Sequence, residues 1–253
     1  MNECVRHRLE RMVSEKSDES RARPMTTQAH SQLFREIIRC DLAPGTWMKA
    51  SDLSSRLGLG LSPIIQALSR LEEAGFVRPV KRKGWQVTPV TLQSVNDIME
   101  AYTLVSPSVV SLIISNATDQ QIATLRDLEV RWAPGHPAPL SDENFDSAPF
   151  AYFVEICGNP FMAEMMRGLS AHLERIMNFS LRQGNFTSGG YNHWRDALFE
   201  AISVRDRDAG THAMVELCRV GGSELKRILQ GTESLLSIPL HSNIDVNARA
   251  TSR

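Results

Sequence analysis

The spacing of apolar residues changes partway through the first hundred residues, and this change constrains the fold more than any other feature. Between residues 33 and 42 apolar side chains recur at helical spacing, and an Ala-Pro-Gly turn follows. Ser51 is a good N-cap for a second helix that ends at Gly58. Ser62 is a similar cap for a third helix, with proline at its first position and Gly75 after its end. The sequence therefore predicts three short helices in a row.

After the third helix the pattern becomes that of two short strands, over residues 76–80 and 85–90. Three short helices followed by a hairpin with a basic tip are typical of a winged helix-turn-helix. In that fold the helix over residues 62–74 is the one presented to the major groove of DNA. The turn of the hairpin consists of Lys81, Arg82, Lys83 and Gly84.

The rest of the chain has helical spacing, so we expect a mainly α protein with an all-helical bundle behind the winged helix. Bundle helices are expected near residues 92–116, 119–130, 142–157, 160–183, 190–204 and 206–229. The expected organisation is a disordered tail over 1–28, a DNA-binding domain over 29–90, a helical domain over 91–230 and a disordered tail over 231–253.

Charge and composition point to a cytoplasmic protein whose front part meets a polyanion. The net charge is −1, but residues 1–90 carry 15 Lys and Arg against 10 Asp and Glu, and residues 91–253 carry 13 against 19. No apolar run is long enough to cross a bilayer, and the first residues lack the apolar core of a signal peptide. The four cysteines are far apart, as in a reducing cytosol. No catalytic motif such as GxSxG or HExxH is present, which argues against an enzyme.

Residues 33–90 resemble the DNA-binding domain of GntR-type bacterial regulators. The shared features, in the family's order, are Leu-Ala-Pro-Gly-Thr at 42–46, Asp52-Leu53, Leu57-Gly58, Pro63, Ala67-Leu68, Arg70-Leu71-Glu72, Gly75 and Gly84. The rear half is similar to the helical FCD effector domain of the FadR-like branch, through Ala117-Thr118, Asp146, Gly158-Asn159-Pro160, Ala201-Ile202, Asp206, Asp208 and Met214. The resemblance implies a transcriptional regulator whose helical domain binds an effector and supports dimerisation.

The recognition helix departs from the family's pattern, Ser-Arg-Thr-Pro-Val-Arg-Glu-Ala-Leu. Here the stretch from Gly60 reads Gly-Leu-Ser-Pro-Ile-Ile-Gln-Ala-Leu, so Leu61 and Ile65 stand where the family has arginine. Arginine bonded to guanine is the commonest specific base contact. Gln66 can instead pair with adenine, and the two aliphatic residues can touch thymine methyl groups. We therefore expect an operator core rich in A·T pairs.

Further candidate DNA contacts are charged or lie at helix starts. The basic turn over residues 81–84 is either a solvated hairpin tip or, with a winged helix before it, a contact to phosphate or the minor groove. Ser51 and Ser62 are expected as phosphate ligands as well as caps, because helix N-termini attract anions. Arg70 is either a surface residue or a phosphate contact.

The FCD resemblance also indicates which residues face a ligand. Members often hold a metal through one Asp and three His; here the aspartate is Asp146, and the histidine positions are Phe150, Arg195 and Leu217. One carboxylate cannot hold a divalent transition metal, so we expect no metal and no other cofactor. Two interpretations of Asp146 and Arg195 remain open. Either the two residues form an ion pair that connects helices of the bundle, or Arg195 binds the carboxylate of an effector. Tyr102 stands where the family has arginine, and together with Phe150 it makes the expected effector pocket more aromatic, which favours an aromatic or otherwise apolar organic acid.

Two functions remain open at this point. The first is a ligand-responsive repressor of a catabolic operon, which binds a palindromic operator as a homodimer. In this interpretation, binding of the effector changes the spacing of the two DNA-binding domains. The second is a divergent partner or sensor protein that has lost DNA binding, which Leu61 and Ile65 suggest and the retained basic hairpin opposes. An enzyme built on the helical domain is a remote third reading.

Overall fold

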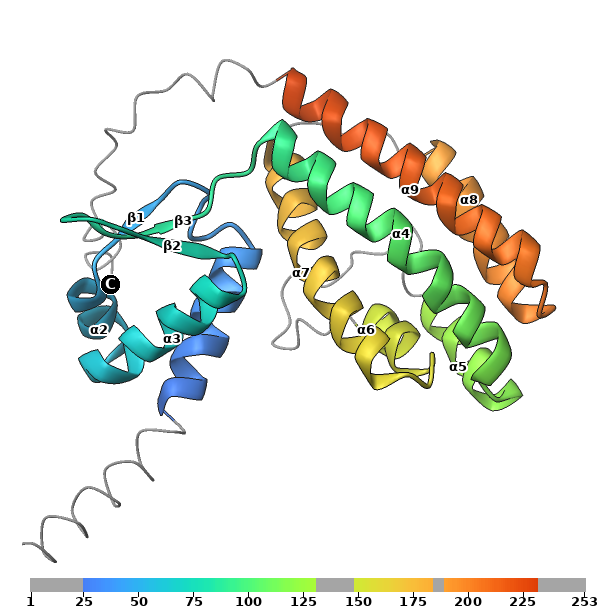
Figure 1. Ribbon diagram of the computed structural model, residues 1–253, viewed down its shortest axis with the longest axis horizontal. Coiled ribbons are helices and arrows are strands. Elements are labelled where there is room, and N and C mark those ends of the chain that lie inside the picture. Colours follow the sequence, from blue (N-terminus) through green and yellow to red (C-terminus); the bar gives the residue numbers. More distant parts are fainter. Residues whose placement is uncertain (1–24, 131–147, 184–188, 232–253) are drawn as a thin grey trace, which may run out of the picture.

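The computed structural model describes residues 25–130, 148–183 and 189–231, and in these ranges a small winged domain precedes a bundle of helices (Figure 1). A helix over residues 25–38 opens the winged domain. It is followed by β1 (Trp47–Met48), α2 (Ala50–Leu57), α3 (Leu61–Glu73), β2 (Val77–Val80) and β3 (Gly84–Val87). The bundle consists of α4 (Leu92–Asn116), α5 (Asp119–Val130), α6 (Ala148–Glu155), α7 (Pro160–Gln183), α8 (Gly189–Ser203) and α9 (Arg207–Gln230).

The three strands form an antiparallel sheet in the order β1-β3-β2. The hairpin was predicted, whereas β1 was not, because two residues are too short a run to show alternation. A buried glutamine fixes the middle strand: Gln86 donates from Nε2 to the carbonyl of Gly45 at 3.0 Å and accepts from the Arg78 guanidinium at 2.7 Å. Since a buried amide must keep its partners, this network specifies the register of the wing.

Two of the predicted caps are wrong. The N-cap of α2 is Lys49 and that of α3 is Gly60, and neither makes a side-chain capping bond, so Ser51 and Ser62 lie inside the first turns. The Ser51 hydroxyl instead lies 3.0 Å from a carboxylate oxygen of Asp52. Pro63 therefore stands at the third position of α3 instead of the first. It is tolerated there because the first N–H groups of a helix have no intrahelical acceptor.

The first helix begins earlier than expected. Residues 25–28 were predicted to belong to a disordered tail, yet they are helical, with Thr26 and Ala29 buried. The Thr26 hydroxyl donates to Oε1 of Gln66 on α3 at 3.0 Å. A contact between distant segments of this kind leaves no periodic signal in the sequence. The other residues of the two predicted tails, except residue 231, fall outside the described residues.

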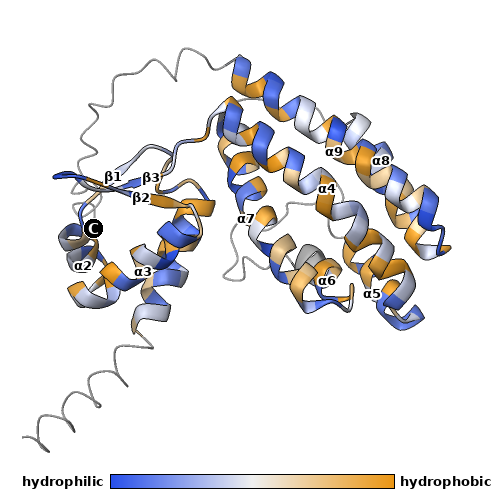
Figure 2. Ribbon diagram, viewed as in Figure 1, coloured by the Kyte–Doolittle hydropathy of each residue, from blue (hydrophilic) through white to orange (hydrophobic). Residues whose placement is uncertain are grey.

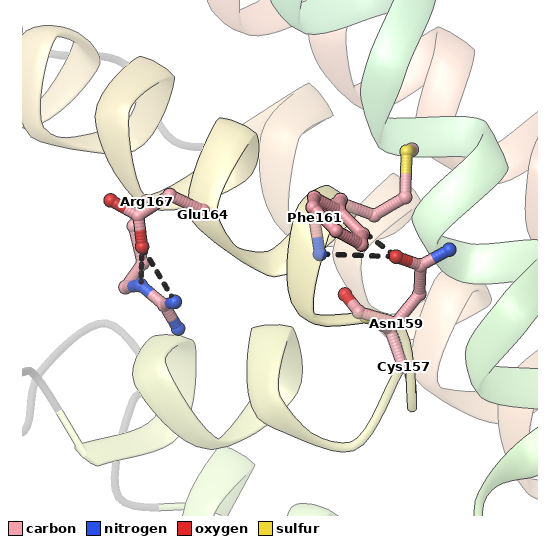
Figure 3. A network of polar contacts seen from close by, with 6 residues as sticks. Cys157, Asn159, Phe161, Glu164 and Arg167 are labelled. Atoms are coloured by element: carbon pink, nitrogen blue, oxygen red, sulfur yellow. Dashed lines mark hydrogen bonds and ion pairs between the residues drawn. The ribbon is translucent and has the colours of Figure 1, made fainter.

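The bundle helices follow the predicted spans, with α4, α5 and α7 at the expected bounds and α8 and α9 within one residue of theirs. Local capping explains these ends. Thr91 and Ser94 form a capping box at the start of α4. At the start of α7, Oδ1 of Asn159 accepts from the backbone N–H groups of Phe161 and Met162 at 3.1 and 3.2 Å (Figure 3). The described part of α6 begins at 148, inside its expected span of 142–157.

Each domain has its own hydrophobic core. One cluster joins the first helix, α2, α3 and the sheet, and the other joins the bundle helices around α4. Figure 2 shows apolar colour along the inner faces of the bundle and hydrophilic colour at the tip of the β2–β3 hairpin. Among the described helices, α4 is long and apolar enough to cross a membrane by length and composition, and here it packs against α7 and α9 as a core helix.

Candidate functional site

The outer face of α3 presents the side chains that the sequence predicts to read DNA. Leu61 and Ile65 are 49% and 43% exposed, while Ile64 and Leu68 on the inner face are fully buried. Leu61 and Ile65 lie four residues apart, so they are neighbours on this face and form one exposed apolar pair. The amide of Gln66 is already engaged, since Oε1 accepts from Thr26 and Nε2 lies 3.4 Å from the Ser62 hydroxyl. Each atom of this amide keeps one more hydrogen-bonding site, because the nitrogen has two N–H donors and the oxygen two lone pairs, so Gln66 can still pair with adenine.

The β2–β3 turn carries exposed basic side chains, as expected. Lys81 and Arg82 lie at its tip, and Lys83 is held over the ring of Trp47, with Nζ 4.9 Å from the ring centroid. Gly84 closes the turn at a φ of 92°, a backbone conformation that other residues rarely adopt. A Cβ at Gly84 would lie 2.5 Å from the carbonyl oxygen of Met48, so glycine is required for β1 to approach the wing.

The remaining predicted DNA contacts differ in how well they suit an anion. Gly60 and Ser62 are exposed at the start of α3, where backbone N–H groups are available. Ser51 is exposed as well, but the adjacent Asp52 carboxylate takes its hydroxyl. Arg70 is exposed in the last turn of α3, at the far end of this helix from Leu61. Burial, and to a smaller extent the charge of Arg70, lowers the pKa of His30 on the first helix.

A pocket lies inside the helical bundle between α4, α7, α8 and α9 and has a volume of about 80 Å³. Its described lining is largely apolar and aromatic, and Arg195 is its single charged member. The lining residues are Met99, Tyr102, Phe153, Leu173, Met177, Tyr191, Arg195, Leu198, Phe199, Met214, Leu217, Cys218, Gly221 and Leu225. One charge in an apolar chamber is the arrangement expected for a ligand with an apolar body and one anionic group.

Arg195 pairs with the carboxylate of the next residue along the chain, Asp196. Its Nη2 and Nε atoms donate to Oδ1 of Asp196 at 2.7 and 3.2 Å. The Arg195 side chain is 10% exposed, whereas that of Asp196 is 62% exposed. Because an exposed carboxylate is well solvated, it can give way to another carboxylate at modest cost. The guanidinium is thus in place to bind an anion inside the chamber.

Two phenols line the same pocket as the guanidinium, with Tyr102 buried and Tyr191 half-buried. Burial raises the pKa of the Tyr102 and Tyr191 hydroxyls, so both remain neutral and can donate hydrogen bonds at physiological pH. Tyr191 was not predicted from the sequence. It lies four residues before Arg195 on α8, so the two share one helix face, and that spacing could have identified it.

The structure brings together part of the predicted effector site. Tyr102, Arg195 and Leu217 all line the pocket. Asp146 falls outside the described residues, and the Phe150 side chain does too, so the expected pair of Asp146 with Arg195 stays a prediction. The lining residues that the structure describes include no His, Asp or Glu and a single thiol, Cys218. A guanidinium does not ligate metals and one thiol is too few ligands, so these residues do not fit the metal that FCD domains often hold.

Comparison with known families and proteins agrees with this two-part architecture. Residues 25–87 match the bacterial regulatory proteins of the gntR family, and residues 97–219 match the FCD domain. The HTH-type transcriptional regulator YdhC of Bacillus subtilis is 21% identical over 212 residues, which cover 82% of this chain and 93% of YdhC. The repressor RspR of Escherichia coli is 22% identical over 209 residues, covering 82% and 91%. The repressor GlaR of Escherichia coli is 34% identical over 88 residues, covering 35% and 40%.

Solved structures share the fold. Escherichia coli McbR/YncC has a TM-score of 0.66 at 17% identity and covers 82% of this chain and 98% of that protein. A GntR regulator from Rhodococcus sp. RHA1 has a TM-score of 0.57 at 17% identity, covering 83% and 96%. The matching families and the relatives named above are transcriptional regulators and not enzymes. This chain therefore belongs to the GntR family of transcriptional regulators, with a winged helix-turn-helix followed by an FCD domain.

Proposed function

We propose that this GntR-family regulator is a cytoplasmic repressor of a catabolic operon, and that a small apolar or aromatic monocarboxylic acid releases it from DNA. The observation that carries the proposal is Arg195, the single charged side chain among the described lining residues of the pocket. Guanidinium matches the geometry of a carboxylate, and the neighbouring phenols add neutral hydrogen-bond donors. Repression is supported by RspR and GlaR, which are named as repressors.

The size of the chamber limits the effector. An apolar cavity of about 150 Å³ accepts benzene, and this pocket of about 80 Å³ is smaller. A short aliphatic acid fits with little rearrangement, whereas an aromatic acid requires the lining to move. Met99, Met177 and Met214 supply that freedom, because methionine has three rotatable bonds and adapts to irregular shapes. Effector binding thus couples to movement of the helices that carry these methionines.

On the DNA side, α3 lies in the major groove and the basic turn contacts phosphate or the minor groove. Leu61 and Ile65 touch thymine methyl groups, which gives an A·T-rich core. A homodimer places two such readers on a palindrome, since two-fold symmetry in the protein matches two-fold symmetry in the operator. The effector shifts the packing of the bundle and so changes the spacing of the two readers.

The proposal is tested by a mobility shift of the full chain on the DNA upstream of its own gene, at several salt concentrations, with benzoate, hexanoate and the neutral amide of each. We expect a salt-sensitive complex that one of the acids releases and that neither amide affects. Arg195→Met should retain DNA binding and lose the response to acid. Release by the amides, or by acid in the Arg195→Met variant, would contradict the role of the guanidinium.

The second candidate, a partner protein that does not bind DNA, rests on the exposure of Leu61 and Ile65. Two apolar side chains on an accessible helix face suit a protein partner as well as thymine methyl groups. Absence of any complex with generic DNA at low salt would favour this candidate, because phosphate contacts do not depend on sequence.

A further inference from the structure

Helix α7 lines the pocket with one face and contacts the winged domain with the roughly opposite face. Leu173 and Met177 line the pocket in the bundle. At about 100° per residue, the side chains of residues 172, 175, 178 and 182 lie on the roughly opposite face. All four of these side chains hydrogen-bond to residues of the winged domain or of the segment that leaves it. The pocket and the DNA-binding domain are thus in contact with the same helix.

His172 lies at the C-terminal end of the recognition helix. Its Nε2 is 2.9 Å from the carbonyl oxygen of Ala74, the C-cap residue of α3. A carbonyl only accepts, so Nε2 carries the proton and donates. The imidazole also stacks on Phe76, with ring centroids 4.2 Å apart and an interplanar angle of 9°. Together these contacts fix both the end of α3 and the residue that leads into β2.

Arg175 fixes the other end of the hairpin. Its Nη1 donates to the carbonyl of Thr88, just after β3, at 2.9 Å, and its guanidinium carbon lies 5.5 Å from the Phe76 ring centroid. The residue is 3% exposed, and burial lowers the pKa of its guanidinium to about 10, so it remains charged at neutral pH. A buried charge whose hydrogen bond is lost is costly, so this contact resists displacement.

The last turns of α7 hold the first helix in the same way. Nδ2 of Asn178 donates to the carbonyl of Ile38 at 2.9 Å. Arg182 donates to the carbonyl of Arg39 and to the carboxylate of Asp41. The C-terminal carbonyls of a helix carry partial negative charge, so donors and cations are favourable there. One face of α7 therefore holds the C-terminal ends of both the first helix and α3.

We propose that His172 and Arg175 are positioning residues for DNA reading: they set the orientation of α3 and so determine operator discrimination without reaching DNA. The proposal rests on the proposed function, in which α3 reads base edges. Contacts to base edges need correct distance and angle, whereas flexible lysines on the wing tolerate small shifts. Tilting α3 therefore weakens operator binding selectively. Because Leu173 and Met177 belong to the same helix, α7 is also the route by which the pocket reaches α3.

The test compares two dissociation constants for each variant of the full chain, at one salt concentration. One duplex is the operator that the wild-type chain selects from a random pool, and the other is a random duplex of equal length. We expect Arg175→Met and His172→Leu each to lower the ratio of operator to random affinity by about tenfold, with random-duplex affinity unchanged. Arg175→Lys, which keeps a donor, should restore most of the ratio. Arg167→Met is the matched control on α7, because Arg167 is exposed and pairs with Glu164 (Figure 3).

A fall in both affinities by the same factor would mean lost folded protein and would overturn a positioning role, as would an unchanged ratio in both variants. Equal affinity of the wild-type chain for the two duplexes would instead refute the proposed reading by α3, and the inference with it. His172→Leu keeps the bulk against Phe76, so it serves where Arg175→Met does not fold.

A second pair of variants tests whether α7 couples the pocket to α3. Leu173 on α7 and Leu198 on α8 both line the pocket, so Leu173→Ala and Leu198→Ala each enlarge it by removing the same side-chain atoms. We expect Leu173→Ala to change the affinity ratio and Leu198→Ala to leave it, and the effect of Leu173→Ala to vanish in the Arg175→Met background. Equal effects of the two alanine variants would overturn α7 as the route.

Discussion

We expect Gly84→Ala to lower the stability of the wing more than the addition of a methyl group at any other position in it. Gly84 has a φ of 92°, where a side chain costs about 1–2 kcal/mol. The added Cβ would also lie 2.5 Å from the carbonyl oxygen of Met48, a backbone atom that moves only if β1 moves. Since β1 pairs with β3 through only two residues, relieving the clash breaks that pairing. Overpacking of this kind costs about 1–3 kcal/mol, so the total destabilisation is about 3 kcal/mol.

Denaturant unfolding of the full chain measures this change, and binding to a random duplex across salt concentrations measures its effect on the wing. We expect the unfolding midpoint of the winged domain to fall and the salt dependence to become less steep, because Lys81 and Arg82 lose their fixed position. Gly168→Ala is the matched control: the position is inside α7, its Cβ meets open space, and alanine there should stabilise by about 0.5–1 kcal/mol. Gly84→Ala unfolding within about 0.5 kcal/mol of wild type would refute the reasoning.

Three more predictions concern charge. Burial raises the pKa of Glu174 from 4.5 to about 8, so the stability that its neutral form contributes is complete below pH 4.5 and is lost as pH rises through 8. Glu174→Gln should therefore raise Tm at pH 8.5 by an amount equivalent to roughly 1–3 kcal/mol and leave it unchanged at pH 4, and equal shifts at both pH values would contradict this. Asp196→Asn should tighten binding of hexanoate, measured by calorimetry, by roughly threefold to tenfold, because it removes a carboxylate that pairs with Arg195; weaker binding would oppose this. Leu61→Arg with Ile65→Arg should bring guanine into operators selected from a random pool, each pair adding about 1–3 kcal/mol of discrimination, and an unchanged A·T core would argue against α3 as the reader.

Much of the fold was predictable because it depends on local signals. The bounds of α4 and α7 follow from apolar periodicity and from capping groups such as Thr91 and Asn159. The caps at Ser51 and Ser62 were wrong because cap preference is a weak local tendency, and tertiary packing starts both helices earlier. Strand β1 could not be predicted, since its pairing partner is almost forty residues away.

The candidate site was predictable only in part. Tyr102 and Arg195 were placed by resemblance, and they meet in the pocket. Tyr191 was identifiable from its spacing to Arg195 and was overlooked. The contacts of α7 with the winged domain had no such signal, because they join His172 and Arg175 to backbone carbonyls, which every sequence possesses.

That choice of acceptor has a consequence for how such regulators diversify. The hydrogen bonds from His172, Arg175 and Asn178 reach main-chain oxygens of Ala74, Thr88 and Ile38, so these three bonds survive exchange of nearly any side chain in the winged domain. A recognition helix with new specificity can be grafted onto this effector domain, provided that an aromatic ring is kept at Phe76 to meet the imidazole. Operator choice and effector choice can therefore evolve, or be engineered, independently while the joint between them stays the same.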